Sequence, residues 1–455
     1  MDFSNEQRLE LWHHLIDQIE RWNQQVSLNP VTPPLDVHLI RQFIEKGKAH
    51  QGQPKAVLDH VVEGLSTLIV QTGHPAYFGL FNPKGSFAGI LADALLAAFN
   101  PQLAAWSHAP WANEIERDVI QRLGERFGFD PIDGTVASGG QEANLTAVLC
   151  ALHAKFPSFG QDGVQGQPVL YTSAESHHSV LKSAACTGLG RSSVRNVPTI
   201  DLKMDVDVLD RMLQEDVAAG RTPFLVVATM GTTGTGVIDP IEKIHTLTQK
   251  YGCWLHADAA WGGGLVIHPQ YKEWLQGIER ADSITFDAHK WWSVPMGTSV
   301  WITRHPEILG KTFRISAEYM PKEGAGQPDP FAHSLPWSRR FLGLRIYLAW
   351  QIYGDDGLAE IIEHQIELGH YLRERLIATG WEITNPTNLP VVCFKRPHWT
   401  PNRGIQAAQE AISSSKVWIS AYPIEGTYSL RACMTNFNTQ KDHIDELIQL
   451  LEAVD

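Results

Sequence analysis

The stretch SITFDAHKWW, residues 283–292, decides the fold prediction. A short apolar run ends in it with Asp287, a histidine and Lys290, followed by two tryptophans. An apolar run of this length with polar residues after it predicts a buried strand. In open α/β sheets ligands bind at the carboxyl ends of strands, so Lys290 is expected at a functional edge. A partly buried lysine suits Schiff-base chemistry, and a solvated surface lysine is the plain alternative.

Apolar runs of the same kind recur upstream at regular intervals and alternate with helical patterns. The runs are residues 169–171, 224–228, 254–257 and 283–286, and the helical stretches between them are residues 177–187, 206–218 and 240–250. Strands that alternate with helices predict βα units around a mostly parallel sheet that is buried on both faces. The predicted fold class is therefore α/β.

Different patterns flank this region. Residues 1–100 predict helices and loops, residues 101–337 a large α/β domain, and residues 338–455 a smaller α+β domain. The smaller domain should contain strands at 389–394, 416–421 and 428–434 and helices at 404–413 and 440–453. Residues 321–337 are rich in proline and glycine, which predicts a long loop of the kind that often has a function.

The composition excludes several classes of partner. The chain has 455 residues and a net charge of −13 at pH 7, so nothing favours binding to nucleic acid or anionic membranes. No apolar run reaches the roughly 18 to 20 residues that a bilayer span needs, and the amino-terminal residues lack a signal-peptide pattern. Five scattered cysteines indicate free thiols in a reducing cytoplasm.

Three further segments carry polar groups suited to ligand binding. Gly139-Gly140 opens a helix, where N–H groups and the helix dipole suit a phosphate, although an ordinary glycine-rich helix start is the alternative. His177-His178 lies in a predicted turn, and an imidazole there could stack on a planar cofactor or simply cap the turn; we expect no metal, because no third ligand is evident.

Asp258 ends the apolar run at 254–257. A buried carboxylate is costly without a cationic partner, which a protonated ring nitrogen would supply, and helix capping is the alternative. Each segment alone is a modest signal. Together they provide a phosphate cradle, a ring stacker, an acid and a lysine, which is the set that pyridoxal 5'-phosphate (PLP) requires.

With these motifs the chain resembles the group II PLP-dependent amino-acid decarboxylases, which act on aromatic amino acids, glutamate or 2,4-diaminobutyrate. The resemblance runs from about His74-Pro75 to the Leu430–Cys433 segment, and its most specific motifs are Asp258-Ala259-Ala260 and His289-Lys290-Trp291. It implies PLP fold type I and a homodimer with the active site near the subunit interface. The implied activity is decarboxylation of an L-amino acid to its amine.

The resemblance also implies a role for individual residues. Lys290 would form the internal aldimine, Asp258 would pair with the pyridine nitrogen, and His177 would stack over the ring. The implied phosphate and cofactor contacts are Gly140, Gln141, Thr233, Ala260, Asp287 and His289. The implied substrate contacts are Asn82, Phe331, His333 and Arg431.

The chain departs from the family pattern at two substrate-facing places. Many members have a loop tyrosine that acts as the final proton donor, but residues 324–334 contain none, and Pro330 or Phe331 stands near its place. A phenylalanine there accompanies oxidative deamination to an aldehyde in related enzymes, so a decarboxylating aldehyde synthase is the alternative. His333 could serve as the acid instead. The segment near Asn82 lacks the threonine of aromatic-specific members, so the substrate stays open.

Two other classes fit less well. An aminotransferase would share the fold, but the His-Lys-Trp motif speaks against it. A non-catalytic nucleotide-binding α/β protein rests only on the glycine-rich run 231–236, and the spacing of that run does not match a dinucleotide-binding fingerprint.

Overall fold

A computed structural model describes residues 3–315 and 328–454. The first part of the predicted 321–337 loop, including the 324–327 portion of the tyrosine-free stretch, therefore lies outside the described residues. Contacts within the chain divide it into two units. The larger comprises Phe81–His370 and Asn385–Val392, and the smaller comprises Met1–Leu80, Tyr371–Thr384 and Cys393–Asp455. The division at residues 100 and 337 that the sequence suggested stays a prediction.

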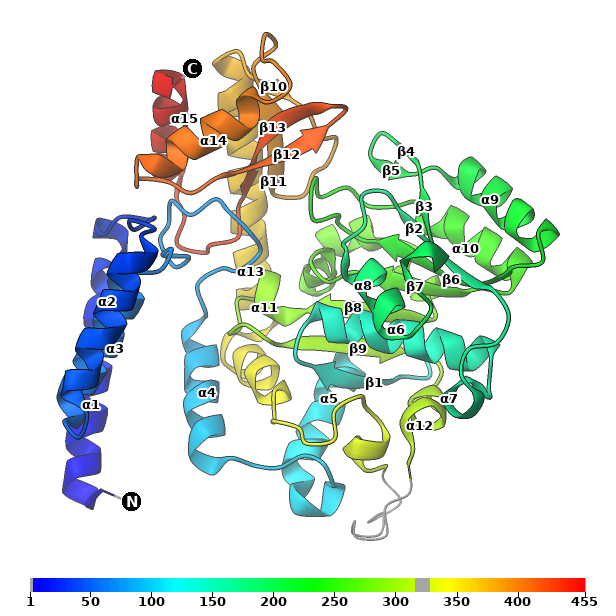
Figure 1. Ribbon diagram of the computed structural model, residues 1–455, viewed down its shortest axis with the longest axis horizontal. Coiled ribbons are helices and arrows are strands. Elements are labelled where there is room, and N and C mark those ends of the chain that lie inside the picture. The colour runs from blue at the N-terminus through cyan, green and yellow to red at the C-terminus, as the bar shows by residue number, and fades with distance from the viewer. Residues whose placement is uncertain (1–2, 316–327, 455) are drawn as a thin grey trace. The chain divides into compact units, whose positions relative to one another are not determined.

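A seven-stranded sheet lies at the centre of the larger unit, in the order β1-β9-β8-β7-β6-β2-β3 (Figure 1). Neighbouring strands from β8 to β3 pair in parallel, and β9 runs antiparallel to both β8 and β1. The predicted mostly parallel sheet is confirmed. Its strands are β1 (Asp133–Ala137), β2 (Pro168–Ser173), β3 (Val194–Val197), β6 (Thr222–Thr229), β7 (Trp254–Asp258), β8 (Ser283–Asp287) and β9 (Ser299–Thr303). A short pair, β4 (Thr199–Ile200) and β5 (Lys203–Met204), stands apart from the sheet.

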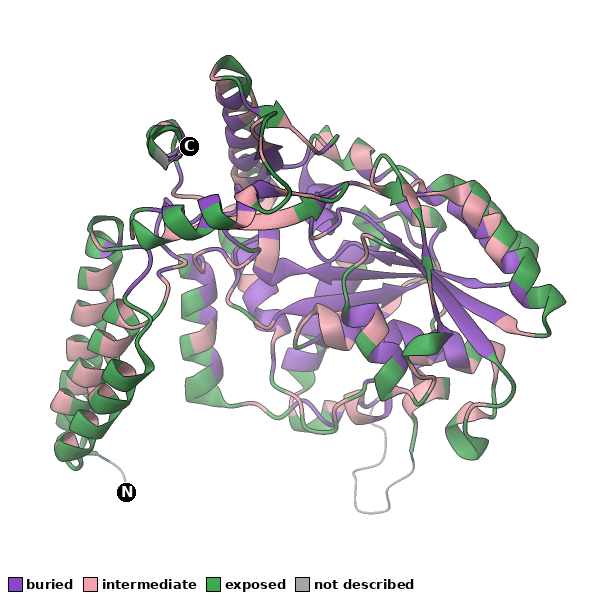
Figure 2. Ribbon diagram, turned by 45° about the horizontal axis from the view of Figure 1, so that its top comes forward, coloured by how far each residue is buried: buried purple, intermediate pink, exposed green. Residues whose placement is uncertain are grey.

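Burial on both faces explains the near-continuous apolar strands. Every residue of β2, β7, β8 and β9 is buried. Figure 2 shows the strands as one buried layer between helices that are exposed on their outer sides. Parallel strands need crossover connections, and helices fill that role here, as predicted from the alternating pattern.

Two helices of the larger unit begin at a side-chain cap. Ser86 caps α4 by accepting the N–H of Gly89, and Asp205 caps α9 in the same way through Asp207 and Val208. The helices are α4 (Phe87–Phe99), α5 (Pro110–Arg126), α6 (Gly140–Lys155), α7 (Phe159–Asp162), α8 (Ser179–Cys186), α9 (Val206–Ala218), α10 (Ile241–Tyr251), α11 (Ala288–Trp291), α12 (Ile308–Phe313) and α13 (Gly343–Ala378). Helix α13 has a kink at Gly354 and continues into the smaller unit.

The smaller unit contains the amino-terminal helices and the predicted carboxyl-terminal α+β elements. Its four-stranded sheet has the order β10-β11-β13-β12. The elements are α1 (Asn5–Gln25), α2 (Val37–Gly47), α3 (Pro54–Thr67), β10 (Glu382–Ile383), β11 (Val391–Lys395), α14 (Arg403–Ser413), β12 (Ser420–Ile424), β13 (Thr427–Cys433) and α15 (Lys441–Val454).

One predicted strand is displaced. The run 416–421 was expected as a strand, but β12 begins only at Ser420. The reason is that Trp418 forms a bridge with the segment around Tyr77, where its N–H donates to Ala76 O at 3.2 Å and its carbonyl accepts the N–H of Phe78 at 2.8 Å. Throughout residues 3–315 and 328–454, none of the helices combines the length and the apolar character that a membrane span requires.

Candidate active site

The carboxyl edge of the seven-stranded sheet, where β6, β7 and β8 end, gathers most of the predicted site residues. Asp258 ends β7 beside Thr285 of β8. Asp287 ends β8 opposite Ser299, which in turn pairs with Ala137 at the end of β1. Strand pairing therefore places the two carboxylates on adjacent strands, with the start of α6 close by.

Lys290 lies on the single helical turn α11 directly after β8. Its Nζ is 3.1 Å from Oδ2 of Asp287, and its side chain is 19% exposed. The Asp287 side chain is almost fully buried and also accepts a hydrogen bond from the Ser299 hydroxyl. The Lys290 ammonium stands 5.9 Å from the centre of the Phe81 ring. These contacts disfavour the surface-lysine alternative, because the amine is largely shielded from water.

Asp258 is buried and receives hydrogen bonds only from uncharged donors. Its Oδ2 accepts from Nδ2 of Asn144 at 2.9 Å, and its Oδ1 accepts the N–H of Ala260 at 3.2 Å. The second bond is a local turn of the kind that the capping alternative predicted. Within the described ranges no lysine, arginine or histidine forms an ion pair with this carboxylate. A buried carboxylate with neutral partners alone suits a cationic ligand.

His177 precedes α8 and is exposed in this chain. Its Nδ1 accepts the N–H of Ser179 at 3.2 Å. Partial dehydration of the ring lowers the pKa of His177; the Asp258 carboxylate opposes this shift, and the charges of Lys290 and His178 add to it. The charges of Asp258 and Lys290, both predicted to take part in catalysis, therefore act on this ring.

The start of α6 has the geometry of an anion-binding site. Among the described residues, no group accepts a hydrogen bond from the N–H groups of Gly140 and Gln141. The neighbouring N–H of Ser138, by contrast, donates to the Glu142 carboxylate at 3.0 Å. A Cβ added at Gly140 would lie 2.7 Å from Oδ2 of Asp287, so only glycine fits without displacement. Free N–H groups in the first turn of a helix bind phosphate oxygens well.

The remaining predicted cofactor contacts border this edge. Gln141 turns its side chain to Ser183 Oγ, at 3.0 Å, so its backbone N–H is the group available for an anion. Ala260 is buried, and its carbonyl accepts the N–H of Asp287 at 3.0 Å, which joins the ends of β7 and β8.

His289 bonds through Nδ1 to the backbone of Thr298, whose carbonyl oxygen is 2.9 Å away. Burial lowers the pKa of His289, with Asp287 opposing. Thr233 is half-buried in the turn after β6.

Four residues that received no role from the sequence complete the edge. Asn144, on α6, joins Asp258 to neighbouring groups. The only indication of this in the sequence was a polar residue on an alanine-rich helix face. Phe81 stacks on Trp261 with ring centres 4.3 Å apart, and Trp261 stacks on Trp291 at 4.9 Å. This aromatic wall borders the Lys290 amine, and no sequence spacing indicated it.

Two of the predicted substrate contacts, His333 and Phe331, have partners of their own within the larger unit. His333 pairs with Asp133, its Nε2 lying 2.9 Å from both carboxylate oxygens. Asp133 begins β1, four positions before Ala137, so His333 lies at the edge opposite Lys290 within this chain. Phe331 packs on Trp337, with ring centres 4.6 Å apart.

The other two predicted substrate contacts fall in different units. Asn82 is half-buried in the larger unit. Arg431 belongs to the smaller unit and donates to the carbonyl of Gly79 at 3.2 Å. The substrate roles of Asn82, Phe331, His333 and Arg431 stay predictions.

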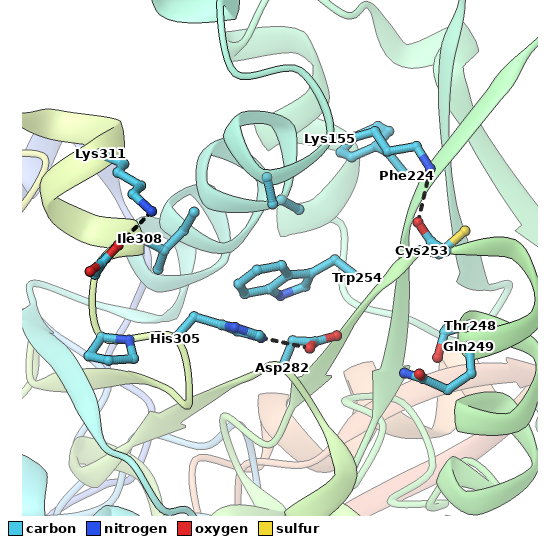
Figure 3. Close-up of a pocket in the computed structure, with 15 residues that line it drawn as sticks. Lys155, Phe224, Thr248, Gln249, Cys253, Trp254, Asp282, His305, Ile308 and Lys311 are labelled. Carbon is cyan, nitrogen blue, oxygen red and sulfur yellow. Dashed lines mark hydrogen bonds and ion pairs between the residues drawn. The ribbon is translucent and has the colours of Figure 1, made fainter.

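A cavity of about 530 Å³ lies at the amino edge of the same sheet, where β6, β7 and β8 begin (Figure 3). Its charged groups pair with one another: Asp282 with His305 at 2.8 Å, Lys311 with Glu307 at 2.6 Å, and Lys155 with the Gly252 carbonyl at 3.0 Å. The cavity is therefore distant from the predicted chemistry, and its polar groups are already satisfied.

The carboxyl edge fits the three functional parts of PLP. The first turn of α6 suits the phosphate, the uncompensated Asp258 carboxylate suits a protonated ring nitrogen, and the Lys290 amine suits the aldehyde. No group of three or more His, Cys, Asp or Glu side chains in the described part of the chain is arranged to hold a metal ion.

Comparisons with known proteins agree with this fit. The family model "Pyridoxal-dependent decarboxylase conserved domain" matches residues 38–396. The chain is 29% identical over 402 residues to an aromatic-L-amino-acid decarboxylase of Bacillus atrophaeus, covering 87% of this chain and 83% of the relative. It is 30% identical over 384 residues to the human cysteine sulfinic acid decarboxylase, covering 82% and 76%.

Two further comparisons bear on activity and on fold. The chain is 26% identical over 457 residues to the 4-hydroxyphenylacetaldehyde synthase of Rhodiola rosea, covering 96% of this chain and 93% of the relative. The crystal structure of mouse CSAD in apo form superposes with a TM-score of 0.91 at 25% identity, covering 98% of each chain. The expected PLP fold is thereby confirmed. The family model covers well over half of the chain, which therefore belongs to the pyridoxal-dependent decarboxylases and is a PLP-dependent carboxy-lyase.

Proposed function

We propose that this enzyme decarboxylates an L-amino acid to the corresponding amine, with Lys290 as the residue that bears the cofactor. The observation that carries the proposal is the pairing of a shielded amine at the end of β8 with an uncompensated carboxylate at the end of β7. When bound, PLP supplies the electron sink that accepts the electron pair from the bond to the α-carboxylate.

Residues of the chain itself are proposed to bind and orient the cofactor. The N–H groups of Gly140 and Gln141 hold phosphate, with Thr233 and His289 beside them. Asp258 keeps a proton on the ring nitrogen, and His177 covers one ring face. Asp287, whose Oδ2 lies 3.1 Å from Nζ of Lys290, orients the lysine side chain at the end of β8.

After carbon dioxide leaves, a proton must return to the α-carbon. Lys290 and His177 are the groups of the carboxyl edge that can deliver it, since residues 324–334 contain no tyrosine. That same absence, with the similarity to an aldehyde synthase, favours oxidative deamination to an aldehyde as the second candidate function, in which dioxygen from solution accepts two electrons and becomes hydrogen peroxide. The named relatives act on aromatic and on sulfinic amino acids, so both substrate classes belong in the test.

The test is to incubate the PLP-loaded enzyme in air with acidic, sulfinic, aromatic and diamino L-amino acids and to quantify carbon dioxide, amine, ammonia and hydrogen peroxide. Carbon dioxide with equal amine supports simple decarboxylation. Stoichiometric ammonia and peroxide support the aldehyde synthase. No release of carbon dioxide from any amino acid contradicts both.

Lys290→Ala is the matched control for this experiment. It should lose the visible absorption of lysine-bound PLP and at least about a thousandfold in turnover, because the chain no longer has the amine that binds the aldehyde. A Lys290→Ala variant that keeps both would exclude Lys290 from the proposed role.

We also propose a homodimer with the active site near the subunit interface. Helix α4 carries an exposed apolar stripe at every fourth position, at Phe87, Leu91, Leu95 and Phe99, with exposed fractions of 60%, 39%, 42% and 80%. A stripe of this size on a monomer surface indicates an interface. Leu95→Asp should convert the dimer to monomers in a light-scattering measurement, and an unchanged mass would exclude this face.

A cytoplasmic location is likewise proposed. It is supported by five cysteines that form no disulfide, of which Cys186 is exposed.

A further inference from the structure

A line of polar side chains lies behind Asp258 on one face of β7. Trp254, His256 and Asp258 alternate along the strand, so all three project toward the same side. Helix α6 covers that side and contributes Asn144. The exposed fractions of Trp254, His256, Asp258 and Asn144 are only 8%, 1%, 4% and 3%, so water does not compete for their hydrogen bonds.

The hydrogen bonds form one continuous chain from Trp254 to Asp258. Trp254 Nε1 donates to Ser283 Oγ at 2.9 Å, and that hydroxyl lies 2.8 Å from Nδ1 of His256. Nε2 of His256 lies 3.1 Å from Oδ1 of Asn144. Nδ2 of Asn144 then donates to Oδ2 of Asp258 at 2.9 Å.

The charge on Asp258 fixes the direction of every bond in this chain. A carboxylate only accepts, so the Asn144 amide must turn its NH₂ group toward Asp258 and its oxygen toward His256. Nε2 of His256 then carries the hydrogen, and Nδ1 accepts from the Ser283 hydroxyl. Burial lowers the pKa of His256 to about 4 against the opposing pull of Asp258, so the imidazole is neutral and holds this single tautomer.

The second N–H of the Asn144 amide goes to the segment that carries His177. It donates to Ser179 Oγ at 2.8 Å, and the N–H of Ser179 is bound to Nδ1 of His177. One amide therefore connects the proposed acid of the ring nitrogen with the proposed stacking residue. A buried amide whose hydrogen bonds all have a fixed direction holds its partners in position.

We propose that Asn144, with His256 behind it, is a positioning residue that keeps Asp258 ionised and fixed toward the ring nitrogen of PLP. This inference rests on the proposed function. It adds that the proton on the ring nitrogen depends on Asn144, because an N–H donor to a carboxylate favours its ionised form. Without that donor the carboxylate is no longer held toward the ring nitrogen, which then loses the partner that keeps it protonated.

The experiment reconstitutes the apoenzyme with ¹⁵N-labelled PLP and measures the dissociation constant and the chemical shift of the ring nitrogen. The Asn144→Leu variant should bind PLP about tenfold to a hundredfold more weakly, the equivalent of one charge-assisted hydrogen bond. Its ring-nitrogen signal should move from the protonated toward the neutral position. A residue that only stabilises the fold would leave this signal unchanged.

Thr146→Val is the matched control. Thr146 is on the same helix and equally buried, but its hydroxyl bonds only within α6, to the Glu142 carbonyl at 3.0 Å. It should keep the wild-type affinity and signal. Wild-type values for both in Asn144→Leu would overturn the inference.

His256 provides an independent pair of variants if Asn144→Leu does not fold. His256→Gln can still present an N–H to Asn144 and should keep the protonated signal, whereas His256→Leu should lose it. Equal signals in the two variants would overturn the inference. If the wild-type protein bound no PLP, the proposed function itself would be wrong. This outcome is distinguishable from a failure of the inference about Asn144, in which the wild type still binds PLP.

Discussion

The two edges of the seven-stranded sheet carry polar groups that differ in one respect. At the amino edge, around the cavity, Asp282 accepts the N–H of Leu255 at 2.7 Å and pairs with His305, so its charge is satisfied within the chain. At the carboxyl edge, Asp258 has only neutral donors, and no group in residues 3–315 and 328–454 accepts the N–H of Gly140. Buried polar groups that lack a full set of hydrogen-bond or charged partners indicate a ligand site better than the volume of a cavity does.

The direction of the strands causes this difference. Strands β2, β6, β7 and β8 run parallel, so their carboxyl ends and the free N–H groups of following helices meet at one edge. The amino edge receives helix carboxyl ends, whose carbonyl groups recruit cations. Lys155 at the Gly252 carbonyl, just after α10, is such a case.

The largest effect that tests this comparison is expected from Asp258→Ala. Removing one partner of a buried ion pair costs about 3 to 5 kcal/mol, so PLP affinity should fall by roughly two to nearly four orders of magnitude, and turnover should fall with it. The measurement is PLP occupancy after dialysis. Unchanged occupancy would contradict the assignment of Asp258 to the ring nitrogen.

His305→Gln is the matched change at the amino edge. The His305 side chain is 44% exposed, and a pair of this kind contributes at most about 1 kcal/mol to stability. PLP occupancy should stay at the wild-type value. A loss comparable to that of Asp258→Ala would show that the two edges do not differ in the way proposed.

A medium effect is expected in the pH dependence of stability. The pKa of His256 falls from 6.5 in the unfolded chain to about 4 in the fold, so between these values the unfolded state binds a proton that the folded state lacks. Stability therefore decreases as the pH falls through this window, by about 2 kcal/mol from pH 7 to pH 5 for this group.

The check is to compare chemical unfolding of the wild type and His256→Gln at pH 7 and pH 5. The variant should lose less stability on acidification. Asp239 acts in the opposite direction, because burial raises its pKa to about 6, but it is common to both proteins and cancels in the comparison. Equal losses in the two proteins would argue against a neutral, buried His256.

The smallest effect concerns adjacent glycines. Gly140→Ala places a methyl group 2.7 Å from the Asp287 carboxylate, which should cost about 1 kcal/mol and weaken PLP binding. Gly139→Ala is the control, since nothing lies within 4 Å of its Cβ and its φ of 162° is extended. If both variants had the same thermal midpoint and the same PLP affinity, the start of α6 could not be the phosphate-binding part of the site.

Much of this site was predictable because strand ends carry polar residues that the interior of a sheet does not tolerate. Asp258 and Asp287 follow apolar runs directly, and Lys290 is three positions further. Asn144 received no role, because a single asparagine in a helix gives no indication of the strand it will face. His333 was considered as an acid from its position in the loop, but its contact with Asp133 depends on two segments 200 positions apart.

The sequence by itself determined the alternation of strands and helices, the lysine three positions after one strand end and the carboxylate at the neighbouring strand end. These are local patterns of burial and polarity, and they repeat at the spacing of the elements. Only the tertiary structure decided that Asn144 joins Asp258 to His256 and that the Phe81 ring stands 5.9 Å from the Lys290 amine. Those facts depend on which distant side chains meet in a buried space, where an unpaired polar group is costly.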